Sequence, residues 1–186
     1  AAYRSHPATT PVAAVARTDE TAARVARAWD VATFTDVALA LAATKPDLVS
    51  VCSPTPLHAV HGELAVRAGA HVLVEKPLAH SVAAGRALIV AASCAGRTLA
   101  VAHTLLYEAG IPELVRLAAA GVLGSVREIR FERQGQDVSP GEVAKGRGPD
   151  APVPVDAAAA RGQLYDHLVH VTYVLNRLAG GALPAA

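Results

Sequence analysis

The sequence predicts an α/β fold: a doubly wound parallel sheet over residues 1–103, followed by part of an α+β domain over residues 104–186. Short apolar runs alternate with helical segments through the first hundred residues, and the links between them are short. This alternation is typical of parallel strands that are covered by helices. Hydrophobic residues make up 52% of the chain and aromatic residues only 4%, so Ala, Val and Leu must fill the core.

The clearest strand is the sequence HVLVEKP at residues 71–77. A strand this apolar belongs inside a parallel sheet, and ligands bind beyond the carboxyl ends of such strands. Pro77 ends the strand because it has no backbone N–H to donate. Glu75 and Lys76 therefore lie where a ligand would bind, although an ordinary surface pair after a core strand is an equally simple interpretation.

The other elements of the first domain follow from apolar runs and capping residues. Residues 1–5 read as the last turn of a helix. Further strands are expected at residues 11–16, 31–34, 48–52 and 98–102. Helices are expected at residues 18–28, 35–43, 57–68 and 81–95. Thr18, Thr35 or Asp36, and Ser81 are the expected N-caps, and Gly69 is a C-terminal stop.

The pattern changes after His103, which marks the domain boundary. Residues 111–120 predict a helix that is closed by Gly121. Residues 124–134 alternate in polarity and predict a half-exposed, antiparallel strand. Residues 135–160 contain several Gly and Pro and predict a long loop. A last helix is expected at residues 163–178.

This last helix carries two stripes. One is apolar and comprises Leu164, Leu168, Val171, Leu175 and Leu178. The other contains Asp166, His170 and Tyr173. Asp166 and His170 are i, i+4 neighbours, so their side chains can touch. The stripe is either a solvated polar face or an acid that orients a histidine base.

Charge and cysteine usage exclude several classes. The net charge is +1, with 17 basic and 16 acidic residues, so nothing favours a nucleic acid or an anionic membrane. No apolar run reaches the ~18 residues of a membrane helix, and no signal peptide is seen. Cys52 and Cys94 lack metal-like spacing, which favours a reduced, cytoplasmic protein. No metal site is expected at the histidine pairs 58/61 and 167/170.

Three motifs together carry a family resemblance. They are VCSPTPLH at residues 51–58, Glu75-Lys76-Pro77, and GQLYDHLVH at residues 162–170. With these motifs in this order, the chain resembles the NAD(P)-dependent oxidoreductases of the glucose–fructose oxidoreductase, inositol dehydrogenase and MocA family. The resemblance covers nearly the whole chain. It implies a Rossmann-type first domain and hydride transfer between a nicotinamide and a hydroxyl carbon of a sugar, a polyol or a related compound.

The resemblance also implies roles for three catalytic residues. Lys76 would contact the nicotinamide ribose and the substrate hydroxyl, Asp166 would hold the substrate, and His170 would be the general acid and base. Histidine titrates near neutral pH, and a lysine stabilises a developing alkoxide. The family commonly has a cis bond at this Lys-Pro pair, so we expect a cis Lys76–Pro77 peptide.

The cofactor and substrate contacts follow from the same resemblance. The expected cofactor-binding residues are Arg17, Thr18, Cys52, Ser53, Pro54, Thr55, His58, Glu75 and Lys76. Arg17 follows the strand at residues 11–16, where an arginine suits a 2′-phosphate, so the cofactor is expected to be NAD(P), with NADP favoured. Asp19 lies close by and weakens that preference, and an ordinary exposed arginine in a turn is an equally simple interpretation of Arg17. His103 and Tyr107 join Asp166 and His170 as substrate contacts, although Leu106 stands where the family has an arginine.

One family element is missing from the sequence. The family begins with a strand and a glycine-rich turn that holds the pyrophosphate, and neither is present. Strands 12–16 and 48–52 would then lack the neighbour that both pair with. The chain is accordingly expected to be truncated at both ends. The alternative to an oxidoreductase is a non-catalytic remnant or binding module that needs another chain. A redox cycle with a net hydrolytic or isomerising outcome, and a homo-oligomer, both stay open.

Overall fold

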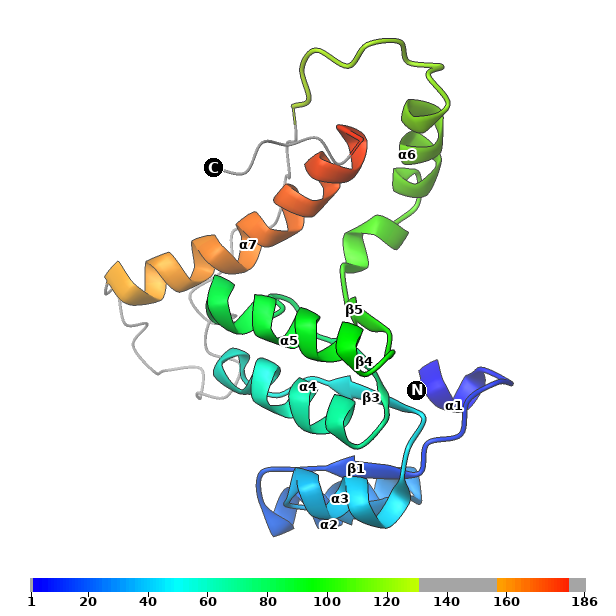
Figure 1. The fold of residues 1–186 in the computed structure, drawn as a ribbon, viewed down its shortest axis with the longest axis vertical. Coiled ribbons are helices and arrows are strands. Elements are labelled where there is room, and N and C mark those ends of the chain that lie inside the picture. The colour runs from blue at the N-terminus through cyan, green and yellow to red at the C-terminus, as the bar shows by residue number, and fades with distance from the viewer. Residues whose placement is uncertain (1, 131–156, 181–186) are drawn as a thin grey trace. The chain divides into compact units, whose positions relative to one another are not determined.

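The computed structural model describes residues 2–130 and 157–180, and side chains in the last helix from residue 168 onward (Figure 1). The chain divides into two compact units, Ala1–Ala102 and His103–Ala186. The first unit contains α1 (Ala2–Ser5), β1 (Ala13–Val15), α2 (Asp19–Trp29), β2 (Ala32–Phe34), α3 (Val37–Thr44), β3 (Leu48–Val51), the 3₁₀ turn η1 (Thr55–Leu57), α4 (His58–Arg67), β4 (His71–Val74), α5 (Val82–Cys94) and β5 (Leu99–Val101). The second contains η2 (Thr104–Tyr107), α6 (Ile111–Ala119) and α7 (Ala157–Leu178).

The predicted caps of the first unit are confirmed. The Thr18 side chain accepts the Thr21 N–H, that of Asp36 accepts the Leu39 N–H, and that of Ser81 accepts the Ala84 N–H. Each bond satisfies a backbone donor that the first helical turn leaves without an intrahelical partner. Asp36, and not Thr35, therefore caps α3. The helices begin where short polar side chains can replace the missing carbonyl groups.

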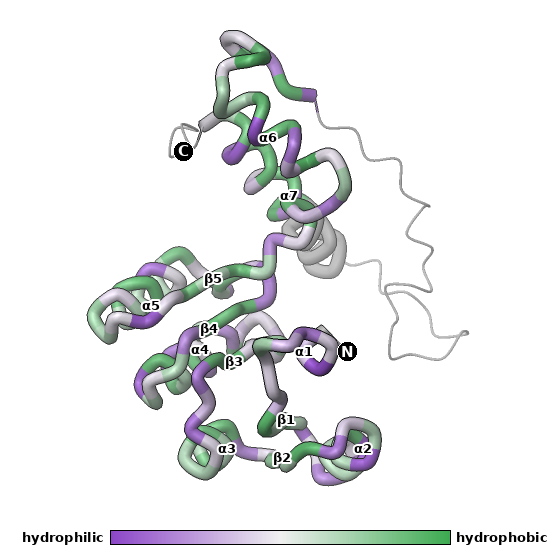
Figure 2. Tube along the Cα trace, turned by 90° about the vertical axis from the view of Figure 1, so that its right-hand side faces the viewer, coloured by the Kyte–Doolittle hydropathy of each residue, from purple (hydrophilic) through white to green (hydrophobic). Residues whose placement is uncertain are grey.

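All five strands pair in parallel, as predicted, but they form two sheets. β1 pairs with β2, and a second sheet has the order β3-β4-β5. Within the described chain, neither β1 nor β3 pairs on its other side. Figure 2 shows α2 and α3 on opposite sides of β1 and β2, while α4 and α5 lie together on one side of β3-β4-β5.

The main core lies between β3-β4-β5 and the two helices α4 and α5. It is built from small and aliphatic side chains: Leu41, Val51, Ala65, Val66, Ala70, Val72, Val74, Leu88 and Ala92. Gly62 lets α4 approach α5 closely, because a Cβ at this position would lie 2.9 Å from Leu88 Cδ2. The absence of large aromatic residues from this cluster agrees with the composition.

The structure corrects two predictions in the second unit. Residues 126–130 form no strand, and the rest of that predicted strand lies outside the described residues. A strand needs a partner for its backbone hydrogen bonds, and the described part of this unit offers none. The last helix begins at Ala157, six residues earlier than predicted, because four alanines with high helix propensity start it. Most of the predicted loop, residues 135–156, lies outside the described residues.

The apolar stripe predicted on α7 is confirmed in part, because Val171, Leu175 and Leu178 are half-buried, while the side chain of Leu164 lies outside the described residues. Leu168 is 48% exposed, whereas Val174, which was not assigned to the stripe, is 1% exposed. The Tyr173 hydroxyl group bonds to the backbone of η2, so the side of α7 that carries Tyr173 and Val174 is packed. Part of the polar stripe of α7 is therefore packed inside the unit. The alternative, in which the whole stripe is a solvated surface, is not what the structure shows.

Candidate cofactor and substrate site

The carboxyl ends of β3 and β4 bring two of the predicted cofactor segments side by side. Val51 pairs with Val74 at the last register position, and the Glu75 N–H donates to the Val51 carbonyl at 2.9 Å. Residues 52–55 and residues 75–77 therefore leave the sheet at adjacent points. Ligands of open parallel sheets bind at this edge, beyond the carboxyl ends of the strands.

The loop after β3 is held by two histidines of α4. His58 Nε2 lies 2.7 Å from the Ser53 carbonyl oxygen, and His61 Nδ1 lies 3.1 Å from Ser53 Oγ. Pro54 precedes η1, which begins at Thr55. Both Ser53 and Thr55 are half-buried, whereas Cys52 and Pro54 are exposed. Two histidines of α4 thus hold the loop at Ser53, while Cys52 and Pro54 stay accessible to a ligand.

The turn after β4 has a fixed geometry. The Lys76–Pro77 peptide is cis, which confirms the prediction. Glu75 Oε2 accepts the backbone N–H of Lys76 at 3.0 Å, so this carboxylate folds back onto its own turn. All three residues are half-buried. Half-burial of a lysine at this end of the strand strengthens its electrostatic effect on a bound group.

The predicted contact between His58 and the cofactor needs revision. His58 is 2% exposed, and both of its ring nitrogens lie 2.7 Å from backbone carbonyl oxygens, those of Ser53 and Pro77. Neither nitrogen is left for a direct contact with a ligand. Sequence spacing placed His58 correctly beside the loop but gave no sign that its ring turns inward.

Cys52 follows β3 directly and its side chain is free of disulfide bonding. Burial raises the pKa of the Cys52 thiol, and the negative charge of Glu75 raises it further. The thiol is the less reactive form of cysteine. Cys52 can therefore line the site but is not suited to act as a nucleophile at neutral pH.

Arg17 and Thr18 follow β1, at the carboxyl end of the other sheet. Both side chains are exposed. The Thr18 hydroxyl already caps α2, so its side-chain oxygen is occupied by the Thr21 N–H at 3.3 Å. Arg17 is the cation at this end of β1, and its exposure leaves it accessible to an anionic group.

In the second unit, Tyr173 joins two of the predicted site residues. Its hydroxyl oxygen accepts the Leu105 N–H at 3.0 Å and lies 2.7 Å from His170 Nδ1. Its ring stacks on that of His103, with centroids 4.0 Å apart. Partial burial lowers the pKa of His103, and the nearby His170 lowers it further. The cluster fixes both histidine rings.

Two other predicted substrate residues are less constrained. Tyr107 lies at the end of η2 and is 83% exposed. Asp166 lies on α7, one turn before His170, but its side chain is outside the described residues. The sequence assigned no role to Tyr173, although its i, i+3 spacing from His170 was the available signal.

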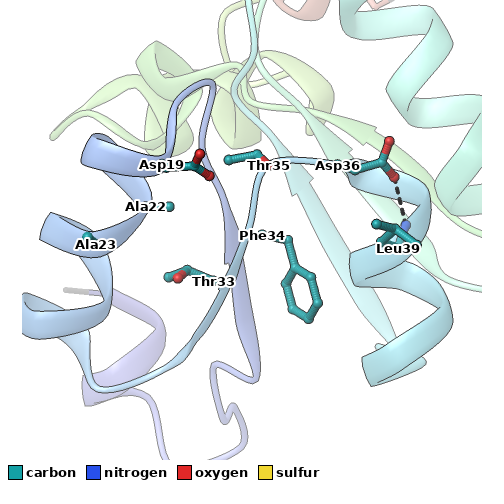
Figure 3. A pocket seen from close by; sticks show the side chains of 8 residues that line it. All are labelled: Asp19, Ala22, Ala23, Thr33, Phe34, Thr35, Asp36 and Leu39. Atoms are coloured by element: carbon teal, nitrogen blue, oxygen red, sulfur yellow. Dashed lines mark hydrogen bonds between the residues drawn. The ribbon is translucent and has the colours of Figure 1, made fainter.

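A separate pocket of about 380 Å³ opens beside β2. Figure 3 shows its lining from α2, β2 and α3, with the carboxylates of Asp19 and Asp36 at one end. Asp36 Oδ1 is engaged by the Leu39 N–H. None of the predicted site residues lines this pocket, which therefore differs in position and charge from the site at β3 and β4.

The part of the chain that the structure describes holds neither a membrane-spanning helix nor a metal-binding cluster. Nowhere in residues 2–130 and 157–180 is a helix long and apolar enough to cross a bilayer. The same residues contain no group of three or more His, Cys, Asp or Glu side chains placed to hold a metal ion.

Comparison with known proteins supports the interpretation of the fold. The profile of the oxidoreductase family with an NAD-binding Rossmann fold matches residues 1–103. D-glucoside 3-dehydrogenase of Escherichia coli (strain K12) is 36% identical over 101 residues, which are 54% of this chain and 27% of that protein.

Two solved structures extend the comparison. A putative dehydrogenase from Bordetella bronchiseptica RB50 superposes with a TM-score of 0.75 at 23% identity, covering 96% of this chain and 45% of that one. KijD10, a 3-ketoreductase from Actinomadura kijaniata in complex with NADP and TDP-benzene, gives a TM-score of 0.60 at 28% identity, covering 68% and 39%. The chain spans less than half of each of these three proteins.

Parallel α/β units with ligand sites beyond the carboxyl ends of their strands include the dinucleotide-binding domains. The chain belongs to the Gfo/Idh/MocA oxidoreductase family, whose first domain is an NAD-binding Rossmann fold.

Proposed function

We propose that the protein of which this chain is part is an NAD(P)-dependent oxidoreductase. It transfers a hydride between a nicotinamide cofactor and a hydroxyl carbon of a sugar, polyol or related compound. The observation that carries this proposal is the adjacency of the Ser53 loop and the Lys76 turn at the carboxyl ends of paired strands. Relatives named D-glucoside 3-dehydrogenase and D-xylose dehydrogenase support the substrate class.

The residues present fit a dinucleotide. The exposed Cys52 and Pro54, the half-buried Ser53 and Thr55, and the Glu75–Lys76 turn offer backbone and side-chain groups at one sheet edge. When bound, the nicotinamide ring supplies the hydride chemistry, and the protein supplies orientation and electrostatics. Lys76 would hold the ribose and the substrate oxygen, where its charge stabilises a developing alkoxide.

His170 would exchange the proton of the substrate hydroxyl, and Asp166 would help to hold the substrate. Tyr173 supports this role because its hydroxyl group lies 2.7 Å from His170 Nδ1 and orients the imidazole ring. His103, stacked on Tyr173, and the exposed Tyr107 are the remaining proposed substrate contacts.

We propose NADP over NAD because Arg17 is exposed after β1. A guanidinium binds a 2′-phosphate through charge-assisted, bidentate hydrogen bonds. Asp19, on the first turn of α2, opposes this preference. Arg17→Ala should weaken NADPH binding while NADH binding changes little, and equal losses for the two nucleotides would refute a phosphate-specific role.

A second candidate function is a non-catalytic binding module, and the split sheet favours it. β1 and β3 each have an edge without a strand partner in the described chain. Such an edge can accept a strand from another polypeptide. In that case the 186-residue chain would bind a nucleotide weakly until the strand is supplied.

The deciding experiment is a fluorescence titration of the purified chain with NADPH and NADH, followed by assays with D-glucosides and 3-keto sugars. Lys76→Ala should abolish hydride transfer and weaken nucleotide binding. Lys45→Ala is the matched control, because Lys45 is an exposed lysine at the C-cap of α3. Binding that is equally unaffected by both substitutions would overturn the proposed role of Lys76. No binding of either nucleotide would favour the second candidate.

A further inference from the structure

His58 is the buried polar residue of the first unit that the proposed mechanism does not use. It is the first residue of α4 and is 2% exposed. His58 Nδ1 lies 2.7 Å from the Pro77 carbonyl oxygen, and His58 Nε2 lies 2.7 Å from the Ser53 carbonyl oxygen. The ring thus spans the loop after β3 and the turn after β4.

The chemistry of these contacts determines the protons of the ring. A carbonyl oxygen can only accept a hydrogen bond, so each ring nitrogen in contact with one must donate. A neutral imidazole has one N–H, and its other nitrogen would then place a lone pair against a carbonyl oxygen inside the protein. Only the imidazolium form, with two N–H groups, satisfies both contacts of a ring that is closed to water.

We propose that His58 is a doubly protonated clamp that holds the Ser53 loop and the Lys76–Pro77 turn at a fixed separation. It is a positioning residue and not a catalytic one, since both nitrogens face backbone. Only the consequence of the clamp rests on the proposed function: the Ser53 loop and the Lys76–Pro77 turn would already be arranged when a dinucleotide binds. Charge-assisted bonds of this kind are stronger than neutral ones.

The surroundings of His58 oppose a positive charge, which the two carbonyl contacts must outweigh. The titratable groups on the two loops and on α4 near these contacts are Cys52, His61, Glu75 and Lys76. Burial lowers the pKa of His61, and the charge of His58 lowers it further. A positive charge at the first residue of a helix is opposed by the helix dipole, so the imidazolium form of His58 depends on its bonds to the Ser53 and Pro77 carbonyl groups.

His71 provides an internal reference within the same unit. Its Nδ1 accepts the Thr98 N–H at 2.9 Å, so this nitrogen carries a lone pair and no proton. His71 begins β4, at the opposite end of the strand from the Lys76 turn. The two histidines are therefore predicted to differ in the protons on their rings, although both are held by backbone groups.

The test is ¹⁵N NMR of histidine-labelled chain at about pH 8.5, roughly two units above the ordinary histidine pKa of about 6.5. We expect the His58 ring to show two protonated nitrogens and the His71 ring to keep an unprotonated Nδ1. A neutral His58 ring, with one unprotonated nitrogen, would overturn the proposal. This measurement uses the unmodified chain and needs no cofactor, so it separates failure of the clamp from failure of the proposed function.

The functional arm compares two variants. His58→Gln keeps one donor but loses the other, and it should weaken NADPH binding about tenfold, as loss of a charge-assisted hydrogen bond does. His71→Gln should leave binding within about twofold. Amide hydrogen exchange should rise in residues 53–57 and 76–78 only in His58→Gln. Unchanged exchange in these residues in a folded His58→Gln would also contradict the clamp.

Discussion

The two parallel sheets of the first unit arise from the same alternation of strand and helix, but they differ in how deeply the helices bury their strand residues. In β3-β4-β5, the valines Val51, Val72 and Val74 are all buried beneath α4 and α5. In β1-β2, Val15 is 44% exposed, and only Ala22, Ala40 and Leu41 are buried on the two helices that flank it. β4 has strand neighbours on both sides, whereas β1 has one. A strand reaches full burial only when neighbouring strands extend the surface on which helices pack.

The largest expected loss of stability comes from a substitution in α5, which covers the better-packed sheet. Leu88→Ala removes a side chain that is 2% exposed and packs against Gly62. The free energy of unfolding should fall by about 2–5 kcal/mol, because the substitution leaves a cavity. Ile89→Ala, at the exposed neighbouring position, should change it by about 0.5 kcal/mol. Urea denaturation measures both, and equal losses would show that α5 is not packed as described.

A matched pair of valine substitutions sharpens the comparison of the sheets. Val74→Ala in β4 should reduce the free energy of unfolding by about 2 kcal/mol, because its side chain is fully buried. Val15→Ala in β1 should cost less than about 1 kcal/mol. The same denaturation experiment compares them. An equal or larger loss at Val15 would indicate that the edge of β1 is covered in solution.

The N-caps of α3 and α5 serve as a control, because their removal should cost the same stability in both regions. Asp36 caps α3 through a 2.8 Å bond from Leu39, and Ser81 caps α5 through a 3.2 Å bond from Ala84. Either substitution to alanine should cost about 1 kcal/mol, because a cap satisfies one exposed backbone N–H whatever the packing below it. Thermal unfolding would show a clear difference between the two if cap strength depended on the core.

The smallest expected effect concerns Cys52 and leaves stability nearly unchanged. In a Cys94→Ser background, alkylation of Cys52 should be slow at about pH 8, because burial and then Glu75 raise the pKa of its thiol. Glu75→Gln lowers that pKa, so more thiolate is present at the same pH. The rate should then rise by less than about tenfold. A rate that falls, or does not change, would exclude an electrostatic effect of Glu75 on Cys52.

The sequence was sufficient for most of the first unit, because its elements are local. Apolar runs located all five strands, and Thr18, Asp36 and Ser81 located three helix starts. The parallel pairing of neighbouring strands followed from the strand and helix alternation and is confirmed. The strand predicted around residue 126 failed because pairing depends on a partner elsewhere in the chain, which alternation alone does not report.

The site was predictable in composition but not in the direction of its side chains. The motif around Lys76 and the cis peptide were recognised from the sequence. The inward rotation of the His58 ring and the contact of Tyr173 with Leu105 were not, since both depend on which face of a helix meets which loop. Spacing places a residue near a site, but only packing decides whether it faces the ligand or supports a residue that does.

Hydrogen–deuterium exchange of the chain with and without NADPH tests the central claim most directly. The account predicts protection of the amides in residues 52–58 and 75–78, at the carboxyl ends of β3 and β4. Protection confined to residues 19–39, around the acidic pocket beside β2, would contradict it and move the ligand site to the smaller sheet.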